Sequence, residues 1–202
     1  METKEQLLAF SIANFTQFGS KSFTMDELAR KLGISKKTIY HYFSNKEELV
    51  TESLQFLLDK VEKEIDTHLN EGVTLPPITK VVYIYKVGLK HMRSFSPSFL
   101  YGLKKYYPKA YDTYDNFRKK IVLGVVHNLL KEAQEQKHIR ADVNLKLVCE
   151  LYLIHMENIV FSHLNLWERY TVHELLEHLI VNNLKGILTF DYTKEYHLLK
   201  HP

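Results

Sequence analysis

The chain has 202 residues, of which 45% are hydrophobic and 25% charged, and its formal net charge is +3. These values are ordinary for a globular protein, and so small a net charge does not by itself indicate a nucleic-acid partner. The only cysteine, Cys149, leaves no intramolecular disulfide possible, and no stretch of about 18 uncharged apolar residues suggests a membrane span. The N-terminus has no signal-peptide pattern, so we expect a cytoplasmic protein without a membrane segment.

Apolar residues recur at helical spacing through most of the chain, and no alternation of period two extends beyond a few residues. We therefore predict an all-α fold of about nine helices, with the segment 70–77 (NEGVTLPP) as the best boundary. The tail 190–202 shows no clear pattern and is expected to be partly disordered. The helices are predicted at about 3–18, 24–32, 35–42, 44–69, 77–94, 97–105, 109–136, 145–168 and 172–189.

A Ser or Thr followed three residues later by Glu is a capping box, which marks the start of a helix. This spacing occurs at three predicted helix starts: Thr24 with Glu27, Ser44 with Glu47, and Thr171 with Glu174. Gly33 separates the second helix from the short third one, so the two form a helix-turn-helix pattern.

The third helix has an unusual distribution of charge. Lys36 and Lys37 follow its predicted cap, Ser35, at the positive end of the helix dipole, where cations are unfavourable. A phosphate partner would compensate, and a helix of this kind fits the major groove of DNA. Besides its core residues, expected to be Ile34, Ile39 and Phe43, the segment leaves seven residues facing outward or at the margin: Ser35, Lys36, Lys37, Thr38, Tyr40, His41 and Tyr42.

Positive charge is concentrated around this helix. Residues 19–46 carry six lysines or arginines and two acids, a local charge of +4 that exceeds the +3 of the whole chain. The alternative is an ordinary surface helix with solvated lysines, but it must also account for the exposed rings of Tyr40, His41 and Tyr42. We therefore predict that this surface contacts double-stranded DNA.

The segment 23–50, FTMDELARKLGISKKTIYHYFSNKEELV, resembles the DNA-binding segment of the TetR/AcrR family of bacterial transcriptional regulators. Weaker similarity extends over 136–153, QKHIRADVNLKLVCELYL, which resembles the entry to the family's eighth helix. The residues at pattern positions are Ala29, Gly33, Ile34, Ser35, Thr38, Ile39, Tyr40, Tyr42, Phe43, Lys46 and Leu49.

The resemblance implies roles for individual residues. Phosphate contacts are implied for Thr24, Tyr42 and Lys46. Base or mixed contacts are implied for Lys36, Lys37, Thr38, Tyr40 and His41. At Lys37 the family often has Gly, Ala or Pro, so a long cation here is a departure that fits either guanine or phosphate.

The apolar pattern of the last two long helices predicts that two copies of the chain form a dimer. The segment 145–168 is apolar on nearly all sides and must be covered all round, and 172–189 has a strong apolar stripe. Two such helices from each of two copies would form a four-helix interface, which the resemblance also implies. The alternative is a central helix buried within one monomer. We expect a DNA-binding domain at 1–46 and an effector-binding and dimerisation domain at 47–189.

An effector site is predicted from the segment 95–117, which has eight aromatic residues in 23 positions. Most of these rings are expected to fill the core, but small-molecule sites are apolar clefts with a few polar groups. The many rings favour a small apolar or aromatic effector, and the lack of an Arg or Lys cluster on the apolar faces argues against a multiply charged anion. The predicted contacts are His91, Phe99, Tyr107, Phe117, Tyr152, His155 and Met156.

The expected function is a homodimeric, ligand-responsive regulator, more specifically a repressor that binds a palindromic operator and is released by its effector. The alternative is an interaction protein with the same fold that has lost specific DNA binding. No catalytic residue, cofactor or metal is expected. Cys149 has no neighbouring base, His173 and His178 lie off a shared helical face, and the chain has no Gly-rich phosphate loop.

Overall fold

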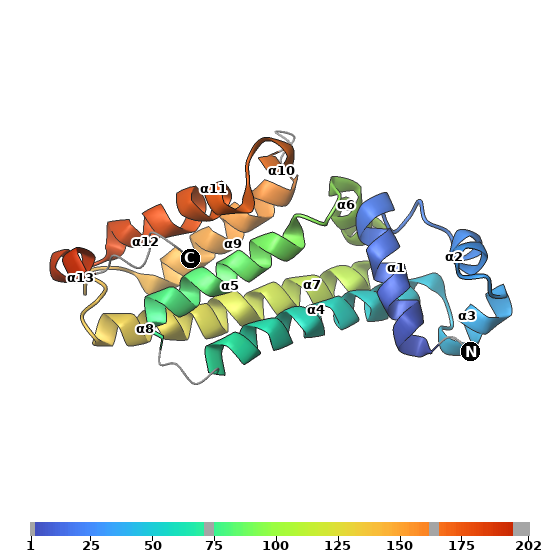
Figure 1. The fold of residues 1–202 in the computed structure, drawn as a ribbon, viewed down its shortest axis with the longest axis horizontal. Coiled ribbons are helices and arrows are strands. Elements are labelled where there is room, and N and C mark those ends of the chain that lie inside the picture. The colour runs from blue at the N-terminus through green and yellow to red at the C-terminus, as the bar shows by residue number, and fades with distance from the viewer. Residues whose placement is uncertain (1–2, 71–74, 162–165, 196–202) are drawn as a thin grey trace. The chain divides into compact units, whose positions relative to one another are not determined.

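The structure, a computed structural model, describes residues 3–70, 75–161 and 166–195 (Figure 1). Within these ranges the chain forms helices and turns without a β-strand, and an isolated bridge joins Ile139 to Leu188. The predicted all-α class is confirmed. None of the described helices combines the length and apolarity needed to cross a membrane.

The chain divides into two compact units. The first unit comprises residues 1–61 and 94–117, and the second comprises residues 62–93 and 118–202. The division falls within two helices, α4 and α7, so each of them contributes residues to both units. These two structural units do not coincide with the predicted functional domains 1–46 and 47–189, and that functional division stays a prediction.

The first unit packs short helices around a core of large apolar side chains. Its elements are α1 (Lys4–Phe18), α2 (Met25–Leu32), α3 (Lys36–Tyr42), the start of α4 (Lys46–Asn70), α6 (Pro97–Tyr106) and most of α7 (Pro108–Lys119). Each of α1, α2, α3, α4 and α6 contributes at least one fully or almost fully buried side chain to this core. These include Leu7, Phe15, Leu28, Ile39, Leu49 and Phe99. Helix α6 lies beside α1 (Figure 1).

Two of the three predicted capping boxes are present. The Thr24 hydroxyl accepts from the Glu27 amide at 3.2 Å, and the Glu27 carboxylate accepts from the Thr24 amide at 2.7 Å. The same reciprocal pair joins Thr171 and Glu174.

The capping box predicted at Ser44 is wrong by one residue. Asn45 Oδ1 accepts from the Glu48 amide at 2.9 Å, and the Glu48 carboxylate accepts from the Ser44 amide at 2.5 Å. Asparagine is as good an N-cap as serine. Helix α4 therefore begins at Lys46 rather than beside Ser44.

The second unit consists of longer helices. Its elements are the end of α4, α5 (Pro77–Met92), η1 (Lys120–Val126), α8 (His127–Glu135), α9 (Leu145–Phe161), α10 (Leu166–Arg169), α11 (Val172–Leu176), η2 (Glu177–Val181), α12 (Asn182–Ile187) and α13 (Phe190–Glu195). The π-helical stretches η1 and η2 join their neighbours end to end, so 108–135 and 172–187 are each one continuous helix. Helix α5 packs on α8 and α11, and α9 packs on η1 and α8.

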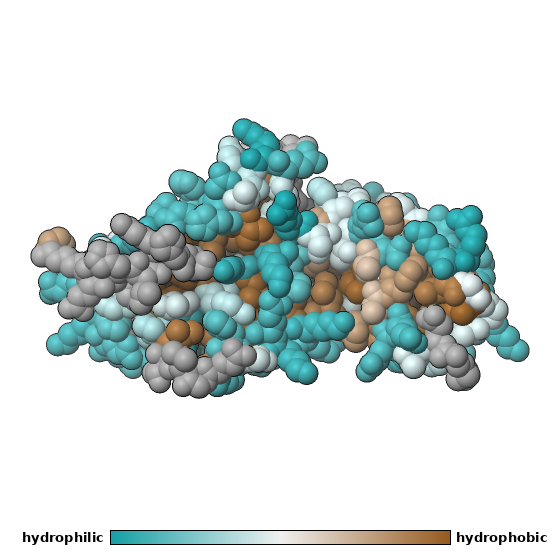
Figure 2. All heavy atoms as spheres, in the orientation of Figure 1, coloured by the Kyte–Doolittle hydropathy of each residue, from teal (hydrophilic) through white to brown (hydrophobic). Residues whose placement is uncertain are grey.

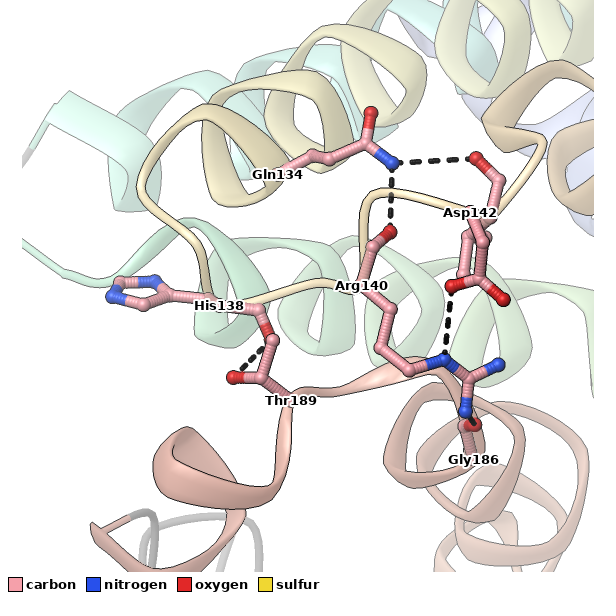
Figure 3. Close-up of polar contacts among 7 residues, drawn as sticks. Gln134, His138, Arg140, Asp142, Gly186 and Thr189 are labelled. Carbon is pink, nitrogen blue, oxygen red and sulfur yellow. Dashed lines mark hydrogen bonds and ion pairs between the residues drawn. The ribbon is translucent and has the colours of Figure 1, made fainter.

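A polar network ties the turn after α8 to the end of α12 (Figure 3). Arg140 donates from Nη1 to the Gly186 carbonyl at 3.1 Å and from Nε to Asp142 Oδ1 at 3.2 Å. Gln134 Nε2 donates to the Arg140 carbonyl at 2.9 Å, and the Thr189 amide donates to the His138 carbonyl at 2.9 Å. The α8–α9 turn and the end of α12 are thereby joined.

The first part of the tail, which the sequence left without a clear pattern, is helical. Residues 190–195 form helix α13, and Tyr192 is buried with its ring stacked 3.9 Å from that of His138. Residues 196–202 lie outside the described part of the chain. With α13 and the short α10, the described residues hold eleven separate helices rather than about nine, each continuous run being counted once.

Candidate nucleic-acid interface

The helix-turn-helix is built by local rules of chain geometry. Helix α2 ends at Gly33, whose φ of 66° is left-handed and therefore suits glycine. The Ile34 amide then returns to the Ala29 carbonyl at 3.0 Å, which closes the turn. Ser35 caps α3 by accepting from the Thr38 amide at 3.1 Å. The Ser35 hydroxyl is thus part of the scaffold that positions α3.

Helix α3 separates core from surface as the sequence predicts. Ile39 is fully buried, and Lys36, Lys37, Tyr40 and His41 are exposed. Thr38 and Tyr42 are half-buried, as is Ile34, which was expected in the core. Figure 2 shows hydrophilic residues over the neighbouring α2. The predicted DNA-contacting side chains of α3 lie on one short polar helix, most of them open to solvent.

The two lysines at the start of α3 differ in their partners. Lys36 Nζ lies 2.5 Å from Asp26 Oδ1 of α2, and this hydrogen bond raises the pKa of Lys36. Lys37 is exposed and makes no ion pair within the described ranges. The cation that opposes the helix dipole at Lys36 is therefore compensated within the protein, whereas the one at Lys37 is compensated only by solvent.

Lys46, at the start of α4, is half-buried. Its ammonium donates to the Lys21 carbonyl at 3.1 Å and lies 5.8 Å from the centre of the Tyr107 ring. Burial lowers the pKa of Lys46, while the nearby Glu27 carboxylate opposes that shift. Lys46 therefore joins the start of α4 to the turn before α2, in addition to any contact with DNA.

The predicted effector residues are divided between the two units. In the first unit, Phe99 is fully buried with its ring 5.3 Å from that of Phe95 and so belongs to the core. Tyr107 is half-buried and donates its hydroxyl to the Ser20 carbonyl at 3.4 Å. Phe117 is half-buried.

In the second unit, His91 Nε2 lies 2.8 Å from Glu64 Oε2, so this ring already has a protein partner. Tyr152 is buried, Met156 is half-buried and His155 is exposed on α9. The structure therefore distributes the seven predicted residues among core, half-buried and exposed environments.

Sequence reasoning missed Tyr85 of α5. This residue is 3% exposed, and its hydroxyl has no hydrogen-bond partner among the described residues. Its ring meets that of Tyr152 edge-on at 5.3 Å. Burial raises the pKa of both tyrosines, and it raises the pKa of Cys149 beside them to about 11. Burial therefore disfavours the charged form of all three groups. A buried hydroxyl without a hydrogen-bond partner, such as that of Tyr85, is rare in folded proteins.

Comparison with known proteins places the chain in a family. The model for "Bacterial regulatory proteins, tetR family" matches residues 3–52, which contain the helix-turn-helix. YvaF, an uncharacterized HTH-type transcriptional regulator of Bacillus subtilis (strain 168), is 32% identical over 167 residues, which cover 82% of this chain and 86% of YvaF. The chain belongs to the TetR family. It is thus a TetR-family transcriptional regulator, as the resemblance implied.

Solved structures of TetR-family proteins and other regulators share the whole fold. FadR of Bacillus subtilis in complex with stearoyl-CoA has a TM-score of 0.74 at 14% identity, over 92% of this chain and 100% of FadR. A putative transcriptional regulator of Saccharomonospora viridis in complex with choline has a TM-score of 0.75 at 14% identity, over 91% of this chain and 96% of that one. At such low identity these likenesses establish the fold alone.

Proposed function

We propose that this TetR-family regulator is a homodimeric repressor, that it binds a palindromic operator through α3, and that a small effector releases it. The observation that carries DNA binding is the exposed set Lys36, Lys37, Tyr40 and His41 on α3, beside a region of net positive charge. Thr38 and Tyr42 would add contacts at the margin of the same helix, and Thr24 and Lys46 would add phosphate contacts at the starts of α2 and α4.

The experiment that tests DNA binding is selection of duplexes from a random pool by the wild-type protein. A recovered palindrome, bound with lower affinity by Lys37→Ala/Tyr40→Ala, is the expected result. If the folded wild type recovers no sequence, the alternative of an interaction protein without specific DNA binding replaces this proposal.

Dimerisation is supported by an apolar stripe on α9 of the second unit. Leu147, Leu151 and Ile154 are 50%, 43% and 52% exposed and follow one another at helical spacing. A second copy, contributing its own α9 and the continuous helix 172–187, would cover this stripe. Two copies would also present two α3 helices to half-sites about 34–36 Å apart, one turn of DNA.

Response to an effector is supported by the unpartnered hydroxyl of Tyr85 in the second unit. Tyr85 and Tyr152 offer phenolic donors in apolar surroundings, and burial disfavours the charged form of both. We therefore propose an apolar effector that carries a neutral oxygen acceptor, such as a carbonyl group. The other predicted contacts remain part of this proposal: His91, Phe99, Tyr107, Phe117, His155 and Met156.

Several structures of similar fold are described by their ligands or by the compounds they regulate. Stearoyl-CoA and choline accompany two of them, and a third is the ketosteroid transcriptional regulator KstR2 of Mycobacterium tuberculosis. This range of chemistry supports a ligand response. A coupling of about 1–3 kcal/mol requires the effector to bind the DNA-free form roughly 5–150-fold better than the DNA-bound form.

The effector proposal is tested by a thermal-shift screen of apolar ketones, esters and amides. A hit should raise the melting temperature of the wild type, lower its DNA affinity, and lose most of its effect on Tyr85→Phe, which removes only the hydroxyl. A hit that acts equally on Tyr85→Phe would place the effector elsewhere.

A further inference from the structure

A second cationic surface lies in the first unit, outside α3. It is formed by Lys21 in the turn after α1 and by Tyr101, Lys104, Lys105 and Tyr106 on α6, all of them exposed. We refer to these five residues as the α6 patch. Helix α6 contains two lysines and no acidic residue.

The tyrosines of the α6 patch hold its lysines against the surface. Lys21 Nζ donates to the Tyr106 hydroxyl at 3.1 Å and lies 4.2 Å from the centre of that ring. Lys105 Nζ lies 5.6 and 5.4 Å from the ring centres of Tyr101 and Tyr106. Neither Lys21 nor Lys105 pairs with a carboxylate within the described ranges. Their charges are positioned but not neutralised.

The α6 patch is fixed to the helix-turn-helix. The Ser96 amide donates to the Thr16 carbonyl at 2.8 Å, which joins the start of α6 to the end of α1. A Cβ at Gly102 would lie 3.0 Å from Ser20 Oγ, so α6 approaches the α1–α2 turn too closely for a larger residue without adjustment. Helix α6 and the turn before α2 therefore pack directly against each other.

The α6 patch is also continuous with the predicted DNA-binding surface. Lys46, a predicted phosphate contact, donates its ammonium to the carbonyl of Lys21 at 3.1 Å. The same ammonium lies over the ring of Tyr107, the residue that follows α6. Cations therefore follow one another from the start of α4 to α6.

We propose that the α6 patch is a second DNA contact, which binds the phosphate backbone beside the bases that α3 reads and does so irrespective of sequence. This proposal rests on DNA binding through α3. Lysine ammonium groups suit phosphate as compact charges, and the tyrosine hydroxyls add donors for the same oxygens. The α6 patch would strengthen binding and make it more dependent on salt without changing the preferred sequence.

The test compares Lys104→Ala/Lys105→Ala with the matched control Lys131→Ala/Lys146→Ala, which removes two exposed lysines of the second unit. Both variants are titrated with the duplex selected by the wild type and with a scrambled duplex, at several salt concentrations. In the α6 variant the slope of log K against log salt should fall by about 0.9 for each lysine removed per bound copy. Affinity for both duplexes should fall by the same factor, while the control matches the wild type.

The outcomes separate this inference from the proposed function. If Lys37→Ala/Tyr40→Ala loses specific binding but Lys104→Ala/Lys105→Ala retains the wild-type salt slope, the α6 patch is not a DNA contact and α3 still is. If the wild type selects no duplex, the proposed function fails first. Binding to phosphatidylserine vesicles that is lost in the α6 variant, with DNA affinity unchanged, would assign the α6 patch to an anionic membrane surface instead. Unfolding curves check that both variants are folded.

Discussion

Lys36 of α3 and Asp26 of α2 form an ion pair with 2.5 Å between Nζ and Oδ1. This contact explains how a lysine is tolerated at the positive end of α3. Asp26 lies in the first turn of α2, where a carboxylate is favoured by the helix dipole, and at the same time it compensates Lys36. The side chains are 49% and 71% exposed, so water and salt weaken the pair and a phosphate can replace the carboxylate.

Asp26→Asn should therefore strengthen DNA binding. The change releases Lys36 and removes a negative charge beside the expected phosphates. We expect affinity to rise by about 0.5–1 kcal/mol per protomer, roughly two- to fivefold, on specific and scrambled duplexes alike. Fluorescence anisotropy titrations at fixed salt measure the effect, and Glu135→Gln, which removes an exposed acid of the second unit, is the control. Unchanged or weaker binding would mean that Asp26 supports α3 in its DNA-binding position.

Lys37 and Lys46 should respond differently to replacement by alanine. Lys46→Ala should weaken binding to all duplexes, lower the salt slope by about one unit, and also lower the melting temperature, because Lys46 anchors the Lys21 carbonyl. Lys37→Ala should leave the melting temperature unchanged, because Lys37 is exposed. If Lys37 contacts a base, its loss should relax preference at one position by about 1–3 kcal/mol. Parallel titrations on single-substitution duplexes distinguish the two, and identical profiles for both variants would contradict the assignment.

Leu151→Glu, in the middle of the α9 stripe, should prevent dimerisation. A charge placed in an apolar interface has no partner, which should raise the dimer dissociation constant at least about a hundredfold. Leu179→Glu on the continuous helix 172–187 should act in the same way. Leu123→Glu is the matched control, because Leu123 is also an exposed leucine of the second unit but lies on η1. Sedimentation velocity gives the answer, and a wild type that is monomeric while binding a palindrome tightly would exclude the interface.

Arg140 and Asp142 should contribute unequally to stability, although they are ion-paired. Both are exposed, so the pair itself is worth little, and Asp142→Asn should cost under about 1 kcal/mol. Arg140→Ala also removes the bond to the Gly186 carbonyl and should cost about 1–3 kcal/mol. Urea unfolding of both variants provides the comparison. Equal losses would show that the ion pair, rather than the bond to α12, holds this corner together.

The features that follow from local rules could be predicted from the sequence. The Thr24 capping box, the left-handed Gly33 turn and the burial of Ile39 depend on residues within a few positions of one another. They place α3 and its exposed side chains correctly. The prediction that Ser44 caps α4 was wrong because Asn45 is an equally good N-cap. Local rules do not choose between two adjacent candidates.

The features that depend on tertiary contacts could not be predicted. Helix α13 is held by stacking of Tyr192 on His138, a residue from another helix end. Lys36 finds its partner, Asp26, on a different helix, so the sequence left its charge uncompensated. In the effector region a tyrosine within an apolar helix has the same pattern whether or not its hydroxyl is bonded. The sequence pattern alone therefore could not show that Phe99 belongs to the core, or that Tyr85 is a candidate effector contact.

The π-helical stretch Lys120–Val126 has a consequence for how this chain should be aligned and shortened. Hydrogen bonds of the i→i+5 type take up more residues per turn than those of an α-helix. Deleting one residue here, for example Gly124, would allow the stretch to close into regular α-helix while the residues on either side keep their faces. A relative one residue shorter at this point can thus share the same bundle. Sequence alignments should accept a single-residue gap inside this long helix, where gaps are usually penalised.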